Sequence, residues 1–233
     1  MVIMMNFTEQ QMQAMRTEVT DSQYLVGQAI VMLGVSLDQW PGVAALMFST
    51  GIEKLMKLIL LLRVQANVRS YGHDLEKILR AITDEDLWED ASFLHDQLTQ
   101  KLIEAMNQMS GSGRYRNVDF LQDVDKFVPP ADLLMGLINF NMMVEDSAAP
   151  ISRGPLDQLV ATMWNREKIV RALYRWMRAV SRTLASPSDN KWDLCGPLAD
   201  WIYGSEYEFM IKPERSGMPP VVVDKLKERE ASI

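Results

Sequence analysis

Apolar residues in the segment 41–66 recur at steps of three and four, which is the spacing of one face of an α-helix. Pro41 suits the first turn of this helix, because the N–H that proline lacks would have no partner there. A helix this long must bury its apolar stripe against neighbouring elements, and this requirement limits the folds open to the chain. The stripe consists of Ala45, Phe48, Ile52, Leu55, Ile59 and Leu62.

The same periodicity predicts further helices along the chain. A start signal, Thr83-Asp84-Glu85-Asp86, places acidic residues in the first turn of one of them. The only run that resembles a strand is Val221-Val222-Val223. We therefore expect an all-α fold, an antiparallel helical bundle with a C-terminal helical extension. The further helices are expected at about residues 8–35, 73–82, 83–109, 129–144, 155–184 and 192–203.

The chain of 233 residues fits one large domain or a domain with an appendage. We expect residues 1–150 to form the bundle. Residues 151–233 then add a long helix with a basic face, a short helix and a proline-containing tail, packed on the same domain. The tail after Gly204 is expected to wrap a partner or to stay mobile.

Composition excludes several classes of protein. Hydrophobic residues make up 48% of the chain, as in ordinary globular domains, and the net charge of −7 argues against a protein that coats duplex DNA. Cys195 is the only cysteine, so no internal disulfide and no cysteine-rich metal site can form. The N-terminus lacks signal-peptide features, and the longest apolar run, 58–62, is too short to cross a bilayer. We expect a cytoplasmic protein with no membrane segment.

The corner between the segments 41–66 and 73–82 contains residue types that hold phosphate groups or cut RNA. Lys54, Arg69 and His73 are expected to meet there, and Lys57 lies on the same side of its helix as Lys54. Asp74 is a plausible cap for the helix that follows. Histidine changes its charge near neutral pH, so it suits proton transfer. His73 is expected either to fix the loop by hydrogen bonding to the backbone or to contact phosphate or RNA.

Three runs in the chain, GIEKLMKLIL, SYGHDLEKIL and GRYRNVD, follow one another in an order that resembles the HEPN superfamily. The resemblance covers about residues 39–119, roughly a third of the chain. It implies a small all-α bundle with a long helix carrying an E-K-x-x-K pattern, then a G-H-D-L step and an R-Y loop. It also implies binding of RNA or a nucleotide, assembly as a homodimer or hetero-complex, and a place in a defence or toxin–antitoxin system.

Ribonucleases of that superfamily carry an arginine, four to six residues and then a histidine. Only three residues separate Arg69 from His73, and no histidine follows Arg114, so the nuclease motif is not matched. This departure favours the binding members of the superfamily. If the chain is an enzyme, the resemblance implies a metal-independent endoribonuclease in which a 2′-hydroxyl attacks the adjacent phosphate. His73 would then move protons and Arg69 would hold charge, and we expect neither a cofactor nor a metal.

The loop Arg114-Tyr115-Arg116 adds two cations and an aromatic ring after a glycine-containing break. Such a loop can stack a base on Tyr115 and hold phosphate with its arginines. Alternatively, Tyr115 packs under the bundle and the arginines are solvated or paired with nearby aspartates.

The segment 155–184 carries five cations at steps of three and four, which places them in one stripe along a helix, and no acidic residue lies between the first and the last. This basic row could follow a nucleic-acid backbone, meet an acidic partner surface, or be a solvated face that pairs with the chain's own carboxylates. Trp164, Tyr174 and Trp176 flank it and could supply stacking. The row consists of Lys168, Arg171, Arg175, Arg178 and Arg182, opposite an apolar side formed by Val170, Leu173, Met177, Val180 and Leu184.

Two alternatives come from other classes of protein. One is a structural helical subunit that docks other proteins through the basic row and the tail. The other is a metal-dependent phosphohydrolase that resembles the HD superfamily, in which bound metal would activate a water for attack on a phosphate ester. Its ligands would be His73, His95-Asp96 and either Asp123 or Asp125, with His95-Asp96 expected in the middle of a helix.

Overall fold

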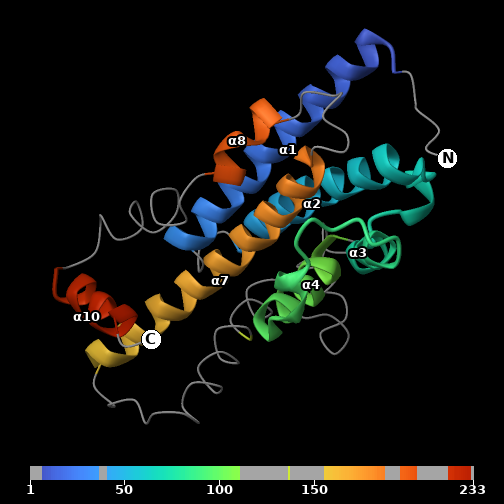
Figure 1. The fold of residues 1–233 in the computed structure, drawn as a ribbon. Coiled ribbons are helices and arrows are strands. Elements are labelled where there is room, and N and C mark those ends of the chain that lie inside the picture. Colours follow the sequence, from blue (N-terminus) through green and yellow to red (C-terminus); the bar gives the residue numbers. More distant parts are fainter. Residues whose placement is uncertain are drawn as a thin grey trace.

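The chain is all-α over the residues that its computed structural model describes, which are 7–36, 41–110, 136, 155–186, 195–203 and 220–231 (Figure 1). These residues form seven α-helices and two short 3-10 helices, and they contain no strand, so the predicted fold class is confirmed. The elements in chain order are α1 (Glu9–Ser36), α2 (Pro41–Val64), η1 (Val68–Tyr71), α3 (Leu75–Asp84), η2 (Ser92–His95), α4 (Gln97–Ser110), α7 (Pro155–Ala185), α8 (Cys195–Tyr203) and α10 (Pro220–Ala231).

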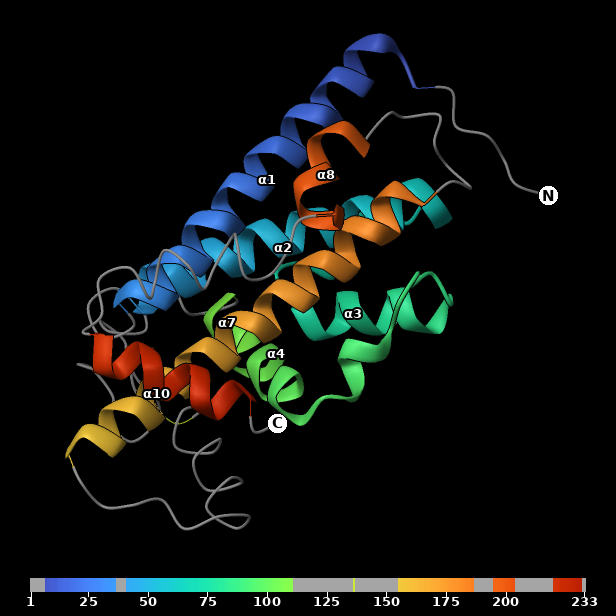
Figure 2. The same cartoon turned by 60° about the vertical axis from the view of Figure 1, so that its left-hand side comes forward.

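The first two helices form an antiparallel hairpin (Figure 2). Their backbones approach closely at Gly51. A Cβ atom added to Gly51 would lie 2.7 Å from the carbonyl oxygen of Ser22 and 2.8 Å from a methyl group of Val26. Only glycine therefore fits this position at the observed separation of the helices. Three residues further along α2, Lys54 forms an ion pair with Glu18 of α1, with Nζ and Oε1 2.7 Å apart.

The long helix α7 packs against both α1 and α2 and completes the main core. The rings of Phe48 and Trp176 lie 5.4 Å apart, and Arg63 at the end of α2 donates to the carbonyl of Thr183 at the end of α7. These two contacts show that α7 runs along the bundle in the same sense as α2, and hence antiparallel to α1. The predicted apolar side of this helix is confirmed, because Val170, Leu173, Met177, Val180 and Leu184 are all buried.

The prediction of one continuous helix over 83–109 is wrong. α3 continues to Asp84, and α4 begins only at Gln97. Asp86 has a left-handed backbone with φ of 52°, which interrupts the helical path. Asp96 then starts α4, because its carboxylate accepts hydrogen bonds from the backbone N–H and the hydroxyl of Thr99 at 3.0 and 2.8 Å.

The short helix predicted at 192–203 is confirmed as α8, whose Trp201 stacks near Tyr174 of α7 at a ring distance of 5.7 Å. Residues 220–231 of the tail form α10, which packs across the N-terminal part of α7 (Figure 2), while partner wrapping by the tail stays a prediction. Val222 and Leu226 are four residues apart and pack against α7. The run 221–223 is therefore helical, since Pro220 starts a helix well and this spacing offers an apolar face.

The helix predicted at 129–144 and the loop 114–116 lie outside the described ranges, apart from Gly136. Within the described ranges, no helix is both long and apolar enough to cross a membrane.

The contact at Gly51 predicts that Gly51→Ala destabilises the protein, because the new methyl group meets backbone that cannot move alone. We expect a loss of about 1–3 kcal/mol in the free energy of unfolding, measured by urea denaturation. Gly27→Ala is the matched control, because its Cβ would meet only the Trp201 ring at an ordinary 3.4 Å. Alanine there should be neutral or stabilise the helix by up to about 1 kcal/mol, and equal losses in the two variants would contradict the close contact.

Candidate functional site

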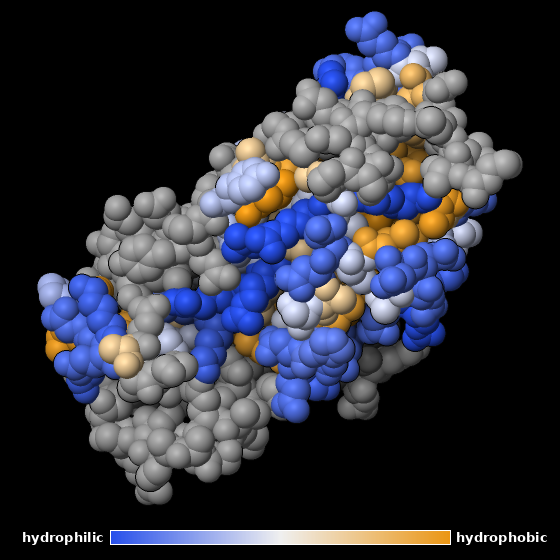
Figure 3. All heavy atoms as spheres, in the orientation of Figure 1, coloured by the Kyte–Doolittle hydropathy of each residue, from blue (hydrophilic) through white to orange (hydrophobic). Residues whose placement is uncertain are grey.

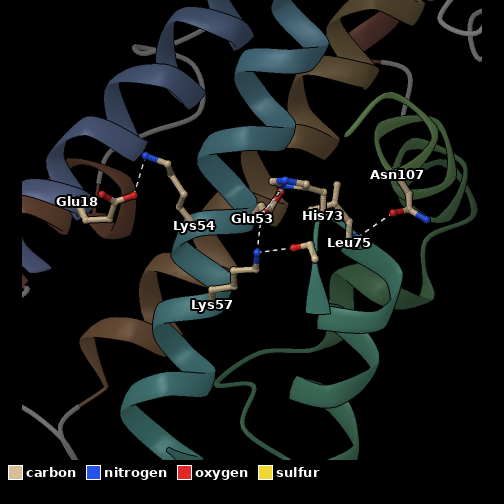
Figure 4. A network of polar contacts seen from close by, with 8 residues as sticks. Glu18, Glu53, Lys54, Lys57, His73, Leu75 and Asn107 are labelled. Carbon is tan, nitrogen blue, oxygen red and sulfur yellow. Dashed lines mark hydrogen bonds and ion pairs between the residues drawn. The ribbon is translucent and has the colours of Figure 1, made fainter. Parts of the chain in front are cut away.

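The corner between α2 and α3 is organised around the buried carboxylate of Glu53, as Figure 4 shows. Lys57 lies one helical turn further along α2, and its Nζ is 2.6 Å from Oε1 of Glu53. Nδ1 of His73 lies 3.1 Å from each oxygen of the same carboxylate. The imidazole is anchored at one edge, although the side chain is 57% exposed to solvent. A carboxylate that fixes the orientation of an accessible histidine is an arrangement suited to proton transfer.

A second contact from Lys57 fixes the turn that carries His73. Its ammonium group donates to the carbonyl of Gly72, which lies between η1 and α3. Gly72 has φ of 57° and ψ of −132°, a backbone conformation that L residues with a side chain rarely adopt. Nothing lies within 4 Å of a Cβ added there, so backbone conformation, and not lack of space, requires glycine.

The start of α3 is fixed by two side-chain acceptors. Asp74 is the cap that the sequence predicts, since its carboxylate accepts from the backbone N–H of Lys77 at 2.9 Å. The amide oxygen of Asn107 on α4 accepts from the N–H of Leu75 at 2.8 Å. Two of the N–H groups that a helix start leaves without partners are thereby satisfied. The position of His73 relative to α2 thus depends on contacts from both α2 and α4.

The expectation that Lys54, Arg69 and His73 meet at this corner is wrong. Lys54 points to the other side of α2 and pairs with Glu18, as Figure 4 shows. Arg69 is exposed in η1, where its backbone carbonyl accepts from the N–H of Gly72. His73 therefore has a carboxylate and an ammonium group as its neighbours, and the corner is not a cationic pocket. Lys57 donates to the backbone of this loop at the carbonyl of Gly72, and a hydrogen bond from His73 to the backbone stays a prediction.

Glu53 was not identified from the sequence as the residue that contacts both Lys57 and His73. A signal for it was present, because Glu53 and Lys57 are four residues apart on a helix and therefore face each other. Glu53 also precedes Lys54 directly, but Lys54 pairs with Glu18 of α1. The burial of the carboxylate follows from the packing of η1 and α3 onto α2, which helical periodicity alone does not describe.

The predicted basic row lies along one face of α7, and Figure 3 shows strongly hydrophilic side chains following the course of this helix. Arg175 is exposed, while Lys168, Arg171, Arg178 and Arg182 are partly exposed. The rise from the first to the last of these residues is about 21 Å at roughly 1.5 Å per residue. Lys168 also lies over the ring of Trp164, with Nζ 5.5 Å from its centroid.

The aromatic residues expected to flank the row for stacking are part of the core. Tyr174 and Trp176 have no exposed surface, and Trp164 is 5% exposed. Trp176 packs on Phe48, and Tyr174 packs near Trp201. The prediction that they stack on bases is therefore wrong, because α7 is covered on these sides by other helices.

The loop 85–91 meets the C-terminal end of the basic row. The backbone N–H of Glu89 donates to the hydroxyl of Thr183 at 3.1 Å. Hydrogen bonds from the side chain and backbone of Ser92 lower the pKa of the neighbouring Asp90 carboxyl below its usual value, and the positive charges of Arg182 and Arg178 add to this effect. Asp90 is therefore ionised at neutral pH and lies near two cations of the row.

The residues considered for a metal site have other surroundings. His95 is exposed at the end of η2, and Asp96 is the cap of α4, so the expectation that both lie in the middle of a helix is wrong. Within the described ranges, no three potential ligands among histidine, cysteine, aspartate and glutamate come together. Asp123 and Asp125, together with the predicted loop residues Arg114, Tyr115 and Arg116, lie outside these ranges.

Comparisons with models of protein families, with curated proteins and with solved structures found no match to this chain.

The geometry of Glu53 predicts that Glu53→Gln lowers the free energy of unfolding by roughly 1.5–3 kcal/mol, because the buried contacts with Lys57 and His73 are charge-assisted. Chemical denaturation measures this loss. Glu18→Gln makes the same chemical change in the pair with Lys54, where both side chains are 38% exposed. It should cost less than about 1 kcal/mol. Equal losses of unfolding free energy would show that the buried carboxylate of Glu53 stabilises the fold no more than the exposed one of Glu18.

Proposed function

We propose that this protein binds RNA or a nucleotide through the basic row of α7. The observation that supports the proposal is the row itself, five cations on one solvent-facing stripe of a helix in a chain of net charge −7. Nucleic-acid backbones attract such stripes because binding releases the counterions condensed on their phosphates. A stripe about 21 Å long, by the roughly 1.5 Å rise of each helical residue, fits several successive phosphates better than a single one.

We also propose that the chain is HEPN-like and belongs to a defence or toxin–antitoxin type of system, as a homodimer or within a hetero-complex. The support comes from the order of the motifs between residues 39 and 119. The E-K-x-x-K pattern lies on a long helix, and the G-H-D-L step begins the helix that packs beside it. Lys57 and His73, which belong to these motifs, both contact Glu53.

RNA binding predicts that the double variant Arg171→Ala/Arg175→Ala weakens binding to a labelled single-stranded RNA. The slope of log K against log salt should become shallower by about 1.4, since each lost phosphate contact removes about 0.7. Fluorescence anisotropy between 50 and 200 mM salt measures both effects.

The control for this double variant is Arg80→Ala/Lys227→Ala, which removes two exposed cations from α3 and α10. Its RNA binding should stay near that of the wild type. RNA binding that is independent of salt, or equal in the two double variants, would reject the row as the binding surface. That result would favour the alternative of a structural subunit that docks other proteins.

A second candidate function is metal-independent cleavage of RNA, which the pairing of His73 with Glu53 favours. A buried carboxylate that holds Nδ1 fixes the orientation of the histidine ring. The exposed ring could then move a proton to or from a ribose 2′-hydroxyl. Arg69 remains the residue proposed to hold charge, since it is exposed on the turn that precedes His73.

Cleavage predicts that His73→Ala abolishes the activity while the bundle stays folded, because the side chain is mostly exposed. Gel analysis of a labelled RNA measures the activity, and circular dichroism checks the fold. His95→Ala is the matched control, because it removes the other histidine, which is exposed on η2. Cleavage that survives in His73→Ala would exclude this residue as the general acid or base.

A further inference from the structure

The C-terminal end of the basic row is held by contacts that converge on Thr183. Thr183 is buried, its hydroxyl accepts from the backbone N–H of Glu89 at 3.1 Å, and its carbonyl accepts from Nη2 of Arg63 at 2.8 Å. The first contact places the loop 85–91 beside Arg182, the neighbour of Thr183 in the chain. The second brings a cation from α2 to the last turn of α7, where the helix carries partial negative charge.

Asp90 lies in this loop but is held by its own segment. Its Oδ1 accepts from the backbone N–H of Ser92 at 2.9 Å. Within the described ranges it forms no ion pair with Arg178 or Arg182, although both arginines favour its ionised form. Nε of Arg178 is buried and has no hydrogen-bond acceptor among the described residues. The carboxylate of Asp90 therefore interacts with the two guanidinium groups electrostatically and accepts no hydrogen bond from them. Their N–H groups stay available to another acceptor, such as a phosphate.

We propose that Arg178 and Arg182 form a phosphate subsite at the end of the basic row, and that the fixed carboxylate of Asp90 weakens the binding of anions there. This inference deepens the proposed function and rests on it for the identity of the ligand, a phosphate of single-stranded RNA. The physical reason is charge repulsion. A phosphate that contacts the two arginines comes close to a carboxylate that Ser92 prevents from turning away.

Arg63 reduces the negative charge that the end of α7 adds to the repulsion of anions by Asp90. The last turn of α7 also carries partial negative charge, and Arg63 satisfies one of its carbonyl groups directly. Glu89 is exposed beside Asp90, but the hydrogen bond at this residue is made by its backbone and does not fix its carboxylate. Asp90 is thus the carboxylate whose position the loop determines.

The test compares Asp90→Asn with Asp86→Asn in the full chain. Both remove one negative charge from the same loop, and asparagine tolerates the left-handed backbone at position 86 as aspartate does. Asparagine at position 90 can still accept from Ser92. In anisotropy titrations with a fluorescein-labelled oligouridine RNA at 50 mM salt, Asp90→Asn should bind about two to five times more tightly than the wild type. Asp86→Asn should change binding by a smaller factor.

A second measurement does not depend on RNA. Sodium sulfate, compared with sodium chloride at equal ionic strength, should raise the Tm of Asp90→Asn more than that of Asp86→Asn. If the two variants respond alike in both measurements, the subsite is rejected. If RNA does not bind but sulfate discriminates the variants, the subsite stands and RNA binding is rejected. If RNA binds while Asp90→Asn and Asp86→Asn are equal in both measurements, RNA binding stands and the subsite, with the role of Asp90 in it, is rejected.

Discussion

The close approach of α1 and α2 at Gly51 is the constraint on which the rest of the structure depends. With a backbone oxygen of α1 only 2.7 Å from the position of a Cβ, any larger residue would push the two helices apart. The same separation brings Glu18 within 2.7 Å of Lys54. It also fixes the faces of α1 and α2 that remain for α7, whose buried side includes Tyr174 and Trp176. The hairpin is thus the support on which the later helices pack.

Successive residues of α2 contact different neighbouring elements because their side chains point in different directions around the helix. Ile52 enters the core, Glu53 is buried toward α3, and Lys54 reaches α1. One turn later Lys57 returns to the side of Glu53 and extends the network to the turn at Gly72. A buried carboxylate is costly unless charges and hydrogen bonds compensate it, and here an ammonium group and an imidazole do so. The corner therefore joins α2 to α3 and presents an exposed histidine at the same time.

The charges of the protein are distributed unevenly. The chain as a whole is acidic, yet α7 carries five cations along one face with no carboxylate of its own between them. One acidic group near this row, Asp90, belongs to the loop 85–91, which the hydroxyl of Thr183 holds in place. The loop and α7 are about ninety residues apart in the sequence, so the folded chain alone brings Asp90 near one end of the row.

The sequence by itself determined the helices and most of their faces. Steps of three and four residues located α1, α2 and α7 to within a few residues, and they identified the buried side of α7 correctly. They also placed the cations of α7 on one stripe, because this follows from helical geometry alone. The break before α4 was missed, because it depends on the backbone of Asp86 and the cap at Asp96. α10 was missed because its apolar residues form a helix face only against Trp164 and its neighbours.

Tertiary structure alone decided which charges meet. Glu53 could have paired with Lys54 or Lys57, and the packing of α1 on one side and α3 on the other assigned Lys54 to Glu18 and Lys57 to Glu53. It also buried Trp164, Tyr174 and Trp176 and placed Asp90 near Arg178 and Arg182. Periodicity describes one helix at a time, whereas ion pairs and burial depend on the distances between helices. Those distances are set by close contacts such as the one at Gly51.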